Sequence, residues 1–140
     1  LGVPCTPPPF GTVSAIDMDS GRLRWQVPLG RARYKGITAP EFLRWGSPNV
    51  GGPIVTAGGL VFIGAALDAR LRALDLEDGR VLWEGPLEAP GMSVPMTYLA
   101  GGRQYVVIAA GGNPRMSPEV SDALMAFALP QAASTRVSSR

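Results

Sequence analysis

The chain has 140 residues, of which 46% are hydrophobic and 17% charged, a composition typical of a globular protein and not of a disordered one. The formal net charge is only +2 and the basic residues alternate with acidic ones, so we expect no nucleic-acid partner. Because the sequence contains no histidine, Ser-His-Asp and Cys-His catalysis and any histidine-ligated metal are excluded from this segment.

The sequence predicts no membrane-spanning segment. The longest apolar runs, residues 60–67 and 105–110, are far shorter than the roughly 20 residues that a membrane helix needs. No signal peptide is recognisable and the first residue is leucine, so we expect a soluble segment of a longer protein.

The first predicted element is a β-hairpin within residues 12–29. Residues 12–18, TVSAIDM, alternate between polar and apolar side chains as a half-buried strand does. Residues 19–21, DSG, form the turn, and the returning strand carries Trp25. Residues 30–50 follow without any period, and we interpret them as a long connection.

Four consecutive short antiparallel strands are predicted within residues 51–87. Residues 51–58 and 59–67 are apolar runs that meet at a Gly-Gly turn. Residues 70–76 and 80–85 form a second hairpin around the turn EDG.

A third group of strands is predicted within residues 94–129. It repeats the plan of the second group, but its last strand is absent or supplied elsewhere. Residues 131–140 are small and polar, and we expect a disordered tail there.

Repeating antiparallel four-stranded meanders predict the blades of a β-propeller, so we expect an all-β fold. Residues 1–130 would hold about two and a half blades: the outer strands of one blade (12–29), a full blade (51–87) and most of a last blade (94–129). So few blades cannot close a ring, and the open strand edges favour self-association.

Residues 15–25, AIDMDSGRLRW, return 58 residues later as ALDLEDGRVLW. The shared pattern Ala-x-Asp-x-x-x-Gly-x-x-x-Trp resembles the tryptophan-docking repeat of the eight-bladed quinoprotein propellers. A wide aromatic ring, which buries about 200 Å², suits an interface between stacked sheets. The resemblance implies structural docking roles for Asp17, Gly21, Trp25, Asp75, Gly79 and Trp83.

Other stretches are similar to the C-terminal end of the membrane-bound quinoprotein glucose dehydrogenases and of the related quinate dehydrogenases. The stretches are LGVPCTPPPFG (1–11), GGPIVTAGGLVFIGAALDARLRAL (51–74), PMTYLAGGRQYVVIAAGG (95–112) and MAFALP (125–130).

This resemblance implies that the parent protein oxidises a sugar or cyclic polyol with pyrroloquinoline quinone (PQQ), which is held by calcium or magnesium. Electrons would pass to ubiquinone at the periplasmic face of the bacterial inner membrane, to which an N-terminal part would anchor the protein. The family's catalytic and metal-binding residues come from upstream blades, so we assign none here. We expect the isolated segment to bind no cofactor and to be inactive.

The resemblance also points to residues that face the cofactor. The loop PNVGG (48–52) matches a family loop near the PQQ ring, which implies cofactor contacts for Asn49, Val50 and Gly51. A turn at the start of a blade, which requires two glycines, explains the same loop equally well, and both interpretations can hold together.

A substrate-adjacent role is implied for Asn113. The glucose enzymes commonly carry a histidine at this place, which is associated with substrate preference. Asparagine can hydrogen-bond a sugar hydroxyl but does not titrate, so glucose as the substrate is in doubt. Asn113 before Pro114 is also ordinary turn chemistry.

Three further charged groups are interpreted structurally. Asp68 matches an aspartate of the family, but a local cap or turn role is favoured over a catalytic one. Arg70 and Arg72 alternate on a strand and are expected to be solvated or paired with acidic neighbours. The Glu77–Asp78 pair belongs to a turn and is too exposed for acid–base work.

Two alternatives stay open. A non-catalytic propeller of the same repeat type, such as the lipoprotein scaffold of outer-membrane β-barrel assembly, would bind polypeptide edges without a cofactor. A lectin-like sandwich fits the number of strands but not the docking repeat.

Overall fold

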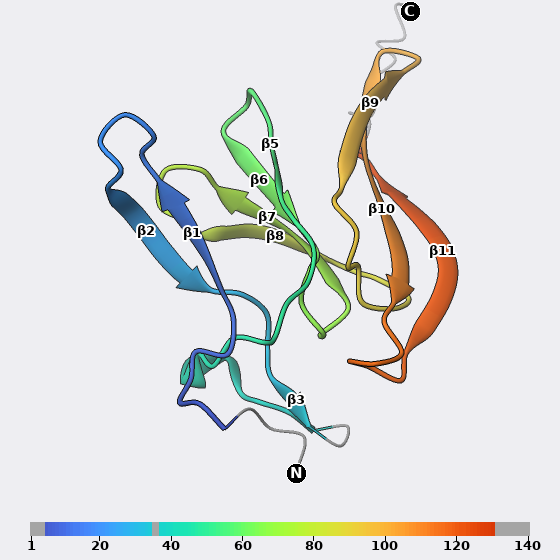
Figure 1. Cartoon of the computed structure of the whole chain (residues 1–140). Helices are drawn as coiled ribbons and strands as arrows, with labels where there is room; N and C mark the ends of the chain where they lie inside the picture. Colours follow the sequence, from blue (N-terminus) through green and yellow to red (C-terminus); the bar gives the residue numbers. More distant parts are fainter. Residues whose placement is uncertain (1–4, 35–36, 131–140) are drawn as a thin grey trace, which may run out of the picture.

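The computed structural model describes residues 5–34 and 37–130, and these residues form strands and turns (Figure 1). They contain strands β1 to β11 and a single three-residue 3-10 helix, η1 (Glu41–Leu43). In these ranges, no helix is long and apolar enough to cross a bilayer. The all-β prediction is therefore confirmed.

The first sheet is the predicted hairpin of β1 (Thr12–Ile16) and β2 (Leu23–Pro28). Its turn is held by Asp17, whose carbonyl accepts from Gly21 N at 2.8 Å and whose carboxylate accepts from Ser20 N at 2.8 Å. Gly21 has a φ of +67°, a conformation that a glycine adopts without steric cost.

The second sheet has four antiparallel strands in the order β5 (Ile54–Val55), β6 (Leu60–Ile63), β7 (Arg70–Asp75) and β8 (Val81–Pro86). Its last turn copies the first hairpin, since Gly79 N donates to Asp75 O at 2.9 Å and Gly79 has a φ of +73°. The sequence repeat is therefore also a structural repeat.

The repeat includes an irregularity. The pairing of β1 with β2 shifts register between Ala15 and Ile16, and the pairing of β7 with β8 shifts between Ala73 and Leu74. In both hairpins one extra residue of the second strand forms a β-bulge next to the tryptophan, because Ala15 pairs with Trp25 and Ala73 with Trp83.

The third sheet contains β9 (Met96–Ala100), β10 (Arg103–Gly112) and β11 (Val120–Phe127), in the order β11-β10-β9. In the described part of the chain, β11 pairs on one side only. The tail predicted over residues 131–140 lies outside the described residues.

The connection between the first two sheets is more ordered than its sequence predicts. It holds η1 and a small hairpin of β3 (Arg33–Tyr34) and β4 (Ile37–Thr38). These two-residue strands lie in a stretch without an apolar run, unlike β5, which falls within the apolar run 51–58, and the pattern therefore shows only a loop.

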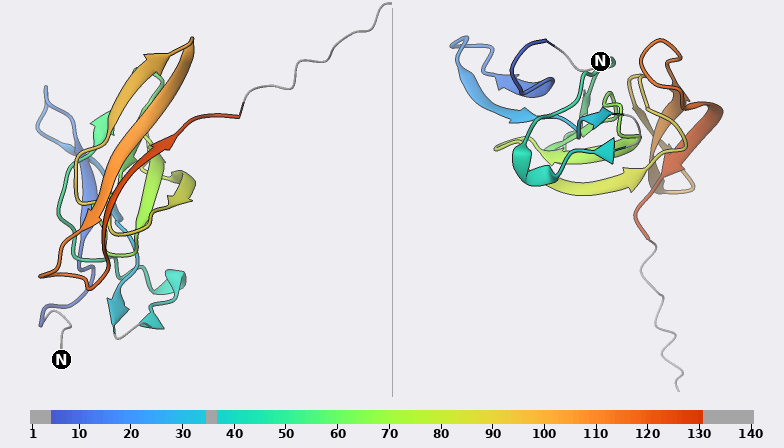
Figure 2. Two further views of the ribbon diagram at one scale, coloured as in Figure 1. Left: turned by 90° about the vertical axis from the view of Figure 1, so that its right-hand side faces the viewer. Right: turned by 90° about the horizontal axis from the view of Figure 1, so that it is seen from below.

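The three sheets stack side by side, with the second sheet in the middle (Figures 1 and 2). Two apolar clusters fill the two interfaces. The cluster at the first sheet includes Leu29, Val61, Ile63 and Leu74, and the cluster at the third sheet includes Leu71, Leu87, Val106 and Ile108. Each face of the middle sheet is thus buried against a different neighbour, as in stacked repeats.

The connecting segments divide between two ends of the stack. The hairpin turns of the docking repeat lie at one end (Figure 1). The other end, which we call the loop end, is formed by residues 29–34, 37–53, 64–69, 87–95 and 112–119. These longer loops contain every residue that the sequence predicts for the cofactor or the substrate.

Candidate functional site

The loop end brings together backbone segments that are far apart in the sequence. Val50 N donates to Ala65 O at 3.0 Å, and Ala65 N donates to Gly91 O at 2.7 Å. Gly112 N donates to Pro90 O at 2.9 Å. Residues 90–92 therefore connect the loop predicted to contact the cofactor with the loop that carries Asn113.

A buried serine fixes the start of the cofactor-facing loop. Ser47 is 0% exposed, and its hydroxyl accepts from Leu67 N at 3.1 Å and donates to Pro48 O at 2.9 Å. Its amide donates to Leu29 O at 2.8 Å. The loop at residues 48–52 thus begins from a rigid point between the first and second sheets.

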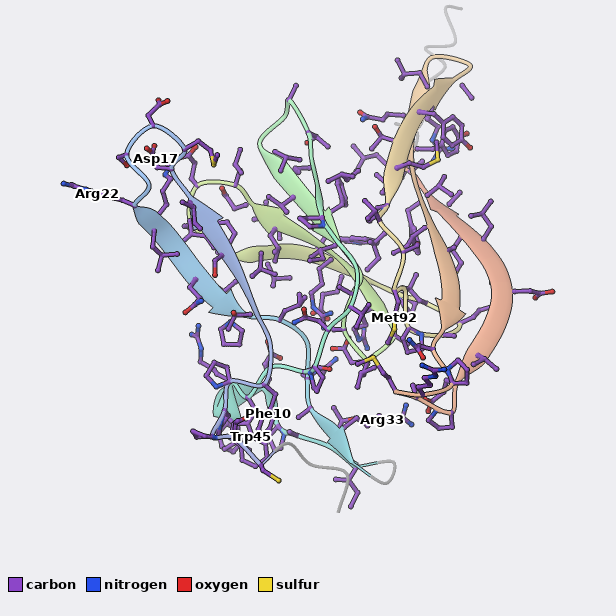
Figure 3. All side chains as sticks on the ribbon, in the orientation of Figure 1. Phe10, Asp17, Arg22, Arg33, Trp45 and Met92 are labelled. Carbon is purple, nitrogen blue, oxygen red and sulfur yellow. The ribbon has the colours of Figure 1, made fainter. Side chains whose placement is uncertain are left out.

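The three residues predicted for cofactor contact differ in what they can offer. Val50 is 46% exposed, so its side chain presents free apolar surface at the loop end. Asn49 is half-buried, and its amide packs so close to Gly11 that any Cβ there would lie 2.3 Å from Asn49 Nδ2. Gly51 has a φ of +131° and runs against the backbone of Met92, which is labelled in Figure 3.

These environments distinguish the residue that can contact a ligand from the residues that support the loop. Val50 is the side chain of the three that is available to a ligand. Gly51 instead permits close backbone approach, since a Cβ there would lie 3.0 Å from Met92 O. The Asn49 amide packs against Gly11 and donates to Ser47 O at 3.4 Å.

Asn113 forms the predicted turn. Its carboxamide Oδ1 accepts from Arg115 N at 3.0 Å, and its carbonyl accepts from Met116 N and Ser117 N, each at 2.9 Å. Among the described residues its Nδ2 group makes no hydrogen bond. Asn113 is half-buried and keeps its amide N–H donors for a hydroxyl oxygen while its other groups shape the loop.

Asp68 has partners that the sequence does not indicate. Its carboxylate forms a bidentate ion pair with Arg72, and each of these side chains is 4% exposed. Asp68 Oδ2 also accepts from Arg31 N at 3.0 Å, across 37 residues. The expected local cap is therefore replaced by a link from β7 to the end of the first sheet.

Arg72 is paired and not solvated. Besides Asp68, it contacts Glu84 with an Nε–Oε1 distance of 2.8 Å. Burial alone would lower the pKa of Arg72, but the two carboxylates outweigh it and raise the pKa above its ordinary value. The cation is thus fully charged, and it neutralises the Asp68 carboxylate, which would otherwise be buried unpaired. The Glu84 side chain is 31% exposed.

Trp25, Gly79 and Trp83 lie at the interfaces between sheets. Asp17 and Gly21 instead belong to the turn of the first hairpin, where Gly21 is exposed and has nothing within 4 Å of an added Cβ. Trp25 Nε1 donates to Leu76 O at 2.9 Å, and the Trp25 ring covers Gly79, where an added Cβ would lie 2.6 Å from a ring carbon. The Trp83 ring meets Phe127 edge to face, with 5.3 Å between centroids.

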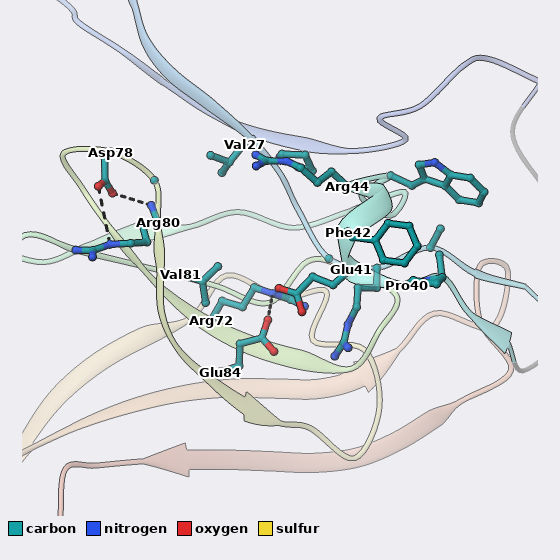
Figure 4. A pocket seen from close by; sticks show the side chains of 17 residues that line it. Val27, Pro40, Glu41, Phe42, Arg44, Arg72, Asp78, Arg80, Val81 and Glu84 are labelled. Atoms are coloured by element: carbon teal, nitrogen blue, oxygen red, sulfur yellow. Dashed lines mark hydrogen bonds and ion pairs between the residues drawn. The ribbon is translucent and has the colours of Figure 1, made fainter.

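A groove of about 680 Å³ lies on the outer side of the stack, between β2, residues 39–45 and β8 (Figure 4). The Arg72–Glu84 pair and the exposed Arg80–Asp78 pair line it. It contains none of the four residues predicted for the cofactor or the substrate. Residues 30–32 and several of residues 39–45 of the loop end line it, so the groove borders the loop end but is separate from those four residues.

The described ranges fit the cofactor only in part. They offer the apolar surface of Val50 and ordered backbone beside it, which suit contact with a planar ring. In residues 5–34 and 37–130, however, no three acidic or cysteine side chains come together as a metal site. Any divalent metal at this face needs ligands from other residues.

Sequence reasoning missed an ion pair at the loop end. Arg33 Nη1 lies 2.8 Å from Glu119 Oε1, although the residues are 86 positions apart. Only their opposite charges could have suggested it, and many other pairs in the chain share that property.

Comparison with known proteins identifies similar sequences over most of the chain. The family described as "Glucose/ethanol/alcohol dehydrogenase, beta-propeller domain", of the PQQ type, matches residues 1–106. The glycerol dehydrogenase large subunit of Gluconobacter thailandicus is 50% identical over 135 residues, covering 94% of this chain and 18% of that protein. The quinate/shikimate dehydrogenase (quinone) of Acinetobacter baylyi is 44% identical, covering 92% of this chain and 16% of that protein.

The quinoprotein glucose dehydrogenase of Escherichia coli is 39% identical, covering 93% of this chain and 17% of that protein. This chain thus spans less than a fifth of the length of these relatives. Among solved structures, the quinohemoprotein alcohol dehydrogenase of Comamonas testosteroni aligns with a TM-score of 0.62 and 26% identity, covering 85% of this chain and 16% of that one. These matches lend no support to the scaffold alternative.

Proposed function

We propose, because this chain belongs to the β-propeller family of PQQ-dependent glucose, ethanol and other alcohol dehydrogenases, that it forms part of a quinoprotein dehydrogenase. The substrate is a polyol, a sugar or a cyclic polyol. The observation that carries this proposal is the sequence identity of 39–50% to three quinoprotein-type dehydrogenases over more than nine-tenths of the chain.

A polyol is favoured over glucose as the substrate. Asn113 offers a free amide donor to a hydroxyl oxygen and carries no proton that titrates near neutral pH. The relative named for glycerol is 50% identical, whereas the relative named for glucose is 39% identical. The first observation supports a contact with an uncharged hydroxyl at this position, and the second supports a polyol as the substrate.

In the proposed enzyme, the residues of this chain bind and orient the cofactor and the substrate. Val50 would provide apolar surface to the PQQ ring, and Ser47 and the Asp68–Arg72 pair hold the backbone that carries Val50. PQQ, held by calcium or magnesium, supplies the electron sink when it is bound. The Trp25 contact with the second sheet keeps the loop end in register with its neighbours.

We also propose a place for the parent protein. It sits at the periplasmic face of the inner membrane, anchored through a part outside this chain, and passes electrons to ubiquinone. The quinate relative, whose name states a quinone acceptor, supports this arrangement.

The experiment is to express the complete reading frame that contains this chain and to load it with PQQ and calcium or magnesium. Oxidation of glycerol, quinate and glucose is then followed with an artificial electron acceptor. We expect PQQ-dependent oxidation, with a lower KM for a polyol than for glucose. A loaded protein that oxidises none of the three substrates contradicts the proposal.

The isolated 140-residue chain serves as the second test. We expect it to be inactive under the same conditions, since no catalytic group is assigned to it. Acceptor reduction by the purified chain with PQQ would overturn this expectation.

A further inference from the structure

An ion pair bridges two loops that belong to different sheets. Arg33 lies on β3, in the connection between the first and second sheets, and Glu119 ends the β10–β11 loop of the third sheet. Arg33 Nη1 donates to Glu119 Oε1 at 2.8 Å. The bridge therefore ties the β3–β4 hairpin to the β10–β11 loop of the third sheet at the loop end, where β3 reaches toward the third sheet (Figures 2 and 3).

The arginine projects from a braced hairpin. Arg33 pairs with Thr38 across β3 and β4, and Ala39 N donates to Ala32 O at 2.8 Å. A parallel bridge joins Arg31 to Gly46. The cation is thus held at a defined place and does not sit on a free loop.

The glutamate is connected to the backbone of Asn113. The Ser117 hydroxyl donates to Glu119 Oε2, and Glu119 N donates to Ser117 Oγ at 3.3 Å. Ser117 is 7% exposed, and its amide donates to the carbonyl of Asn113 at 2.9 Å. The route from Arg33 to Asn113 therefore passes through two side chains and one backbone hydrogen bond.

The loop needs such an anchor. It begins at Gly112, which has a φ of +69° and lies so close to Glu119 O that a Cβ would come within 2.1 Å. The register of β10 with β11 shifts between Ala110 and Gly112, and pairing resumes at Gly112 with Val120, so the strands hold the base of the loop but not residues 113–119. An exposed ion pair contributes little to overall stability, but it can select one position of a short loop.

We propose that Arg33 and Glu119 are positioning residues that hold the Asn113 loop against the substrate side of the site. This inference rests on the proposed function, since it takes Asn113 as the group beside a substrate hydroxyl. Loss of the pair then weakens polyol binding, and it leaves the chemical step almost unchanged because neither residue contacts the reacting atoms.

The first test follows hydrogen exchange of the amides of residues 113–119 in the complete protein without cofactor. Glu119→Gln keeps an acceptor for Ser117 but removes the charge, and Arg33→Leu removes the cation. We expect each variant to speed exchange in this loop about threefold or more, and Arg33→Lys to stay near the original rate because a single N–H contact survives.

A matched control is available at the opposite end. Arg24 and Glu77 also form an exposed pair between two sheets, with an Nη2–Oε2 distance of 2.9 Å. Glu77→Gln breaks that pair far from the loop. We expect exchange in residues 113–119 to be unchanged in this control.

The second test is kinetic and uses the PQQ-loaded protein. Glu119→Gln and Arg33→Leu should each raise the polyol KM about three- to tenfold with kcat within about twofold, and Arg33→Lys should restore the original KM. If the two breaking variants match the original protein in both exchange and KM, the inference is overturned. If the original protein oxidises no polyol, the proposed function fails, and the exchange data alone then decide whether the pair positions the loop.

Discussion

Two tryptophans occupy the same place in the sequence repeat but lie in different surroundings. Trp25 donates a hydrogen bond to Leu76 O at 2.9 Å and lays its ring over Gly79 of the next sheet. Trp83 is 40% exposed and meets the edge of Phe127 at an interplanar angle of 70°. The first interface is closed by a turn of the next repeat, and the second by an aromatic contact.

The cause lies in the neighbouring unit and not in the tryptophan itself. Residues 73–79 of the second unit read ALDLEDG. The corresponding residues of the third unit, 126–132, read AFALPQA. The third unit therefore has no glycine at the place where the preceding tryptophan would dock. A docking contact needs a tryptophan on one sheet and a glycine turn on the next.

The largest expected effect on stability comes from removing the two tryptophan rings. Trp25→Ala should lower the free energy of unfolding by about 4 kcal/mol, because it removes ring contacts and one interface hydrogen bond. Trp83→Ala should cost about 2 kcal/mol, since its ring is less buried. Urea unfolding of the 140-residue chain measures both, and equal losses would contradict the distinction.

The glycines of the two turns sharpen the comparison. Gly79→Ala should cost about 3 kcal/mol, because the new Cβ strains a backbone of positive φ and also collides with the Trp25 ring. Gly21→Ala is the matched control, since Gly21 has a similar φ but nothing within 4 Å of the added Cβ. It should cost about 1 kcal/mol, and a similar loss in both variants would mean that the ring moves freely aside.

A pH effect should also differ between the two turns. The Ser20 hydroxyl, together with the Ser20 amide, lowers the pKa of Asp17 below its ordinary 3.8. The unfolded chain therefore binds this proton more readily, so the stabilisation is present above the ordinary pKa and is lost as the pH falls through the lower folded value. The second turn has Asp78 in place of Ser20 and lacks this hydroxyl donor.

Titration by NMR in Ser20→Ala tests the cause. We expect the pKa of Asp17 to rise toward 3.8, with a smaller loss of stability in acid than in the original chain. An unchanged Asp17 titration would show that the hydroxyl is not responsible.

The smallest effect concerns the ion pair that spans the first interface. Arg24→Gln should reduce stability by less than about 0.5 kcal/mol, because both side chains of the Arg24–Glu77 pair are largely exposed. Leu82 stands at the equivalent place of the second repeat and cannot form such a pair. If Arg24→Gln costs more than about 1 kcal/mol, and a double-mutant cycle with Glu77→Gln assigns that loss to the ion pair, then charge and not the ring closes this interface.

The longer strands and the docking turns could be predicted from the sequence because their causes are local. Alternation with period two, Gly in tight turns and a repeated motif all act over about ten residues. The hairpin of β3 and β4 was not predicted, because its two-residue strands lie in a stretch of sequence, residues 30–50, that shows no hydrophobic period. It depends on contacts such as the bridge of Arg31 to Gly46.

The pairing of the charged groups could not be predicted from the sequence. Asp68 suggested a local cap, but its partners are a buried strand arginine and the backbone of Arg31, which is 37 residues away. The Arg33–Glu119 pair spans 86 residues. Such pairings are set by how sheets stack, and a single sequence does not record that stacking. The roles of Val50 and Asn113 at the cofactor and the substrate stay predictions, although the structure shows which of their groups are free.

The β-bulges next to the two tryptophans bear on ancestry. Regular hairpins arise many times for simple physical reasons, so a shared regular hairpin says little about descent. Here both hairpins carry the same extra residue at the same step, Arg24 in one and Leu82 in the other. A copied irregularity of this kind is the mark of a duplicated ancestral unit. It also means that the units can diverge by substitution at these two positions, whereas a deletion there would turn the strand over and remove the tryptophan from its interface.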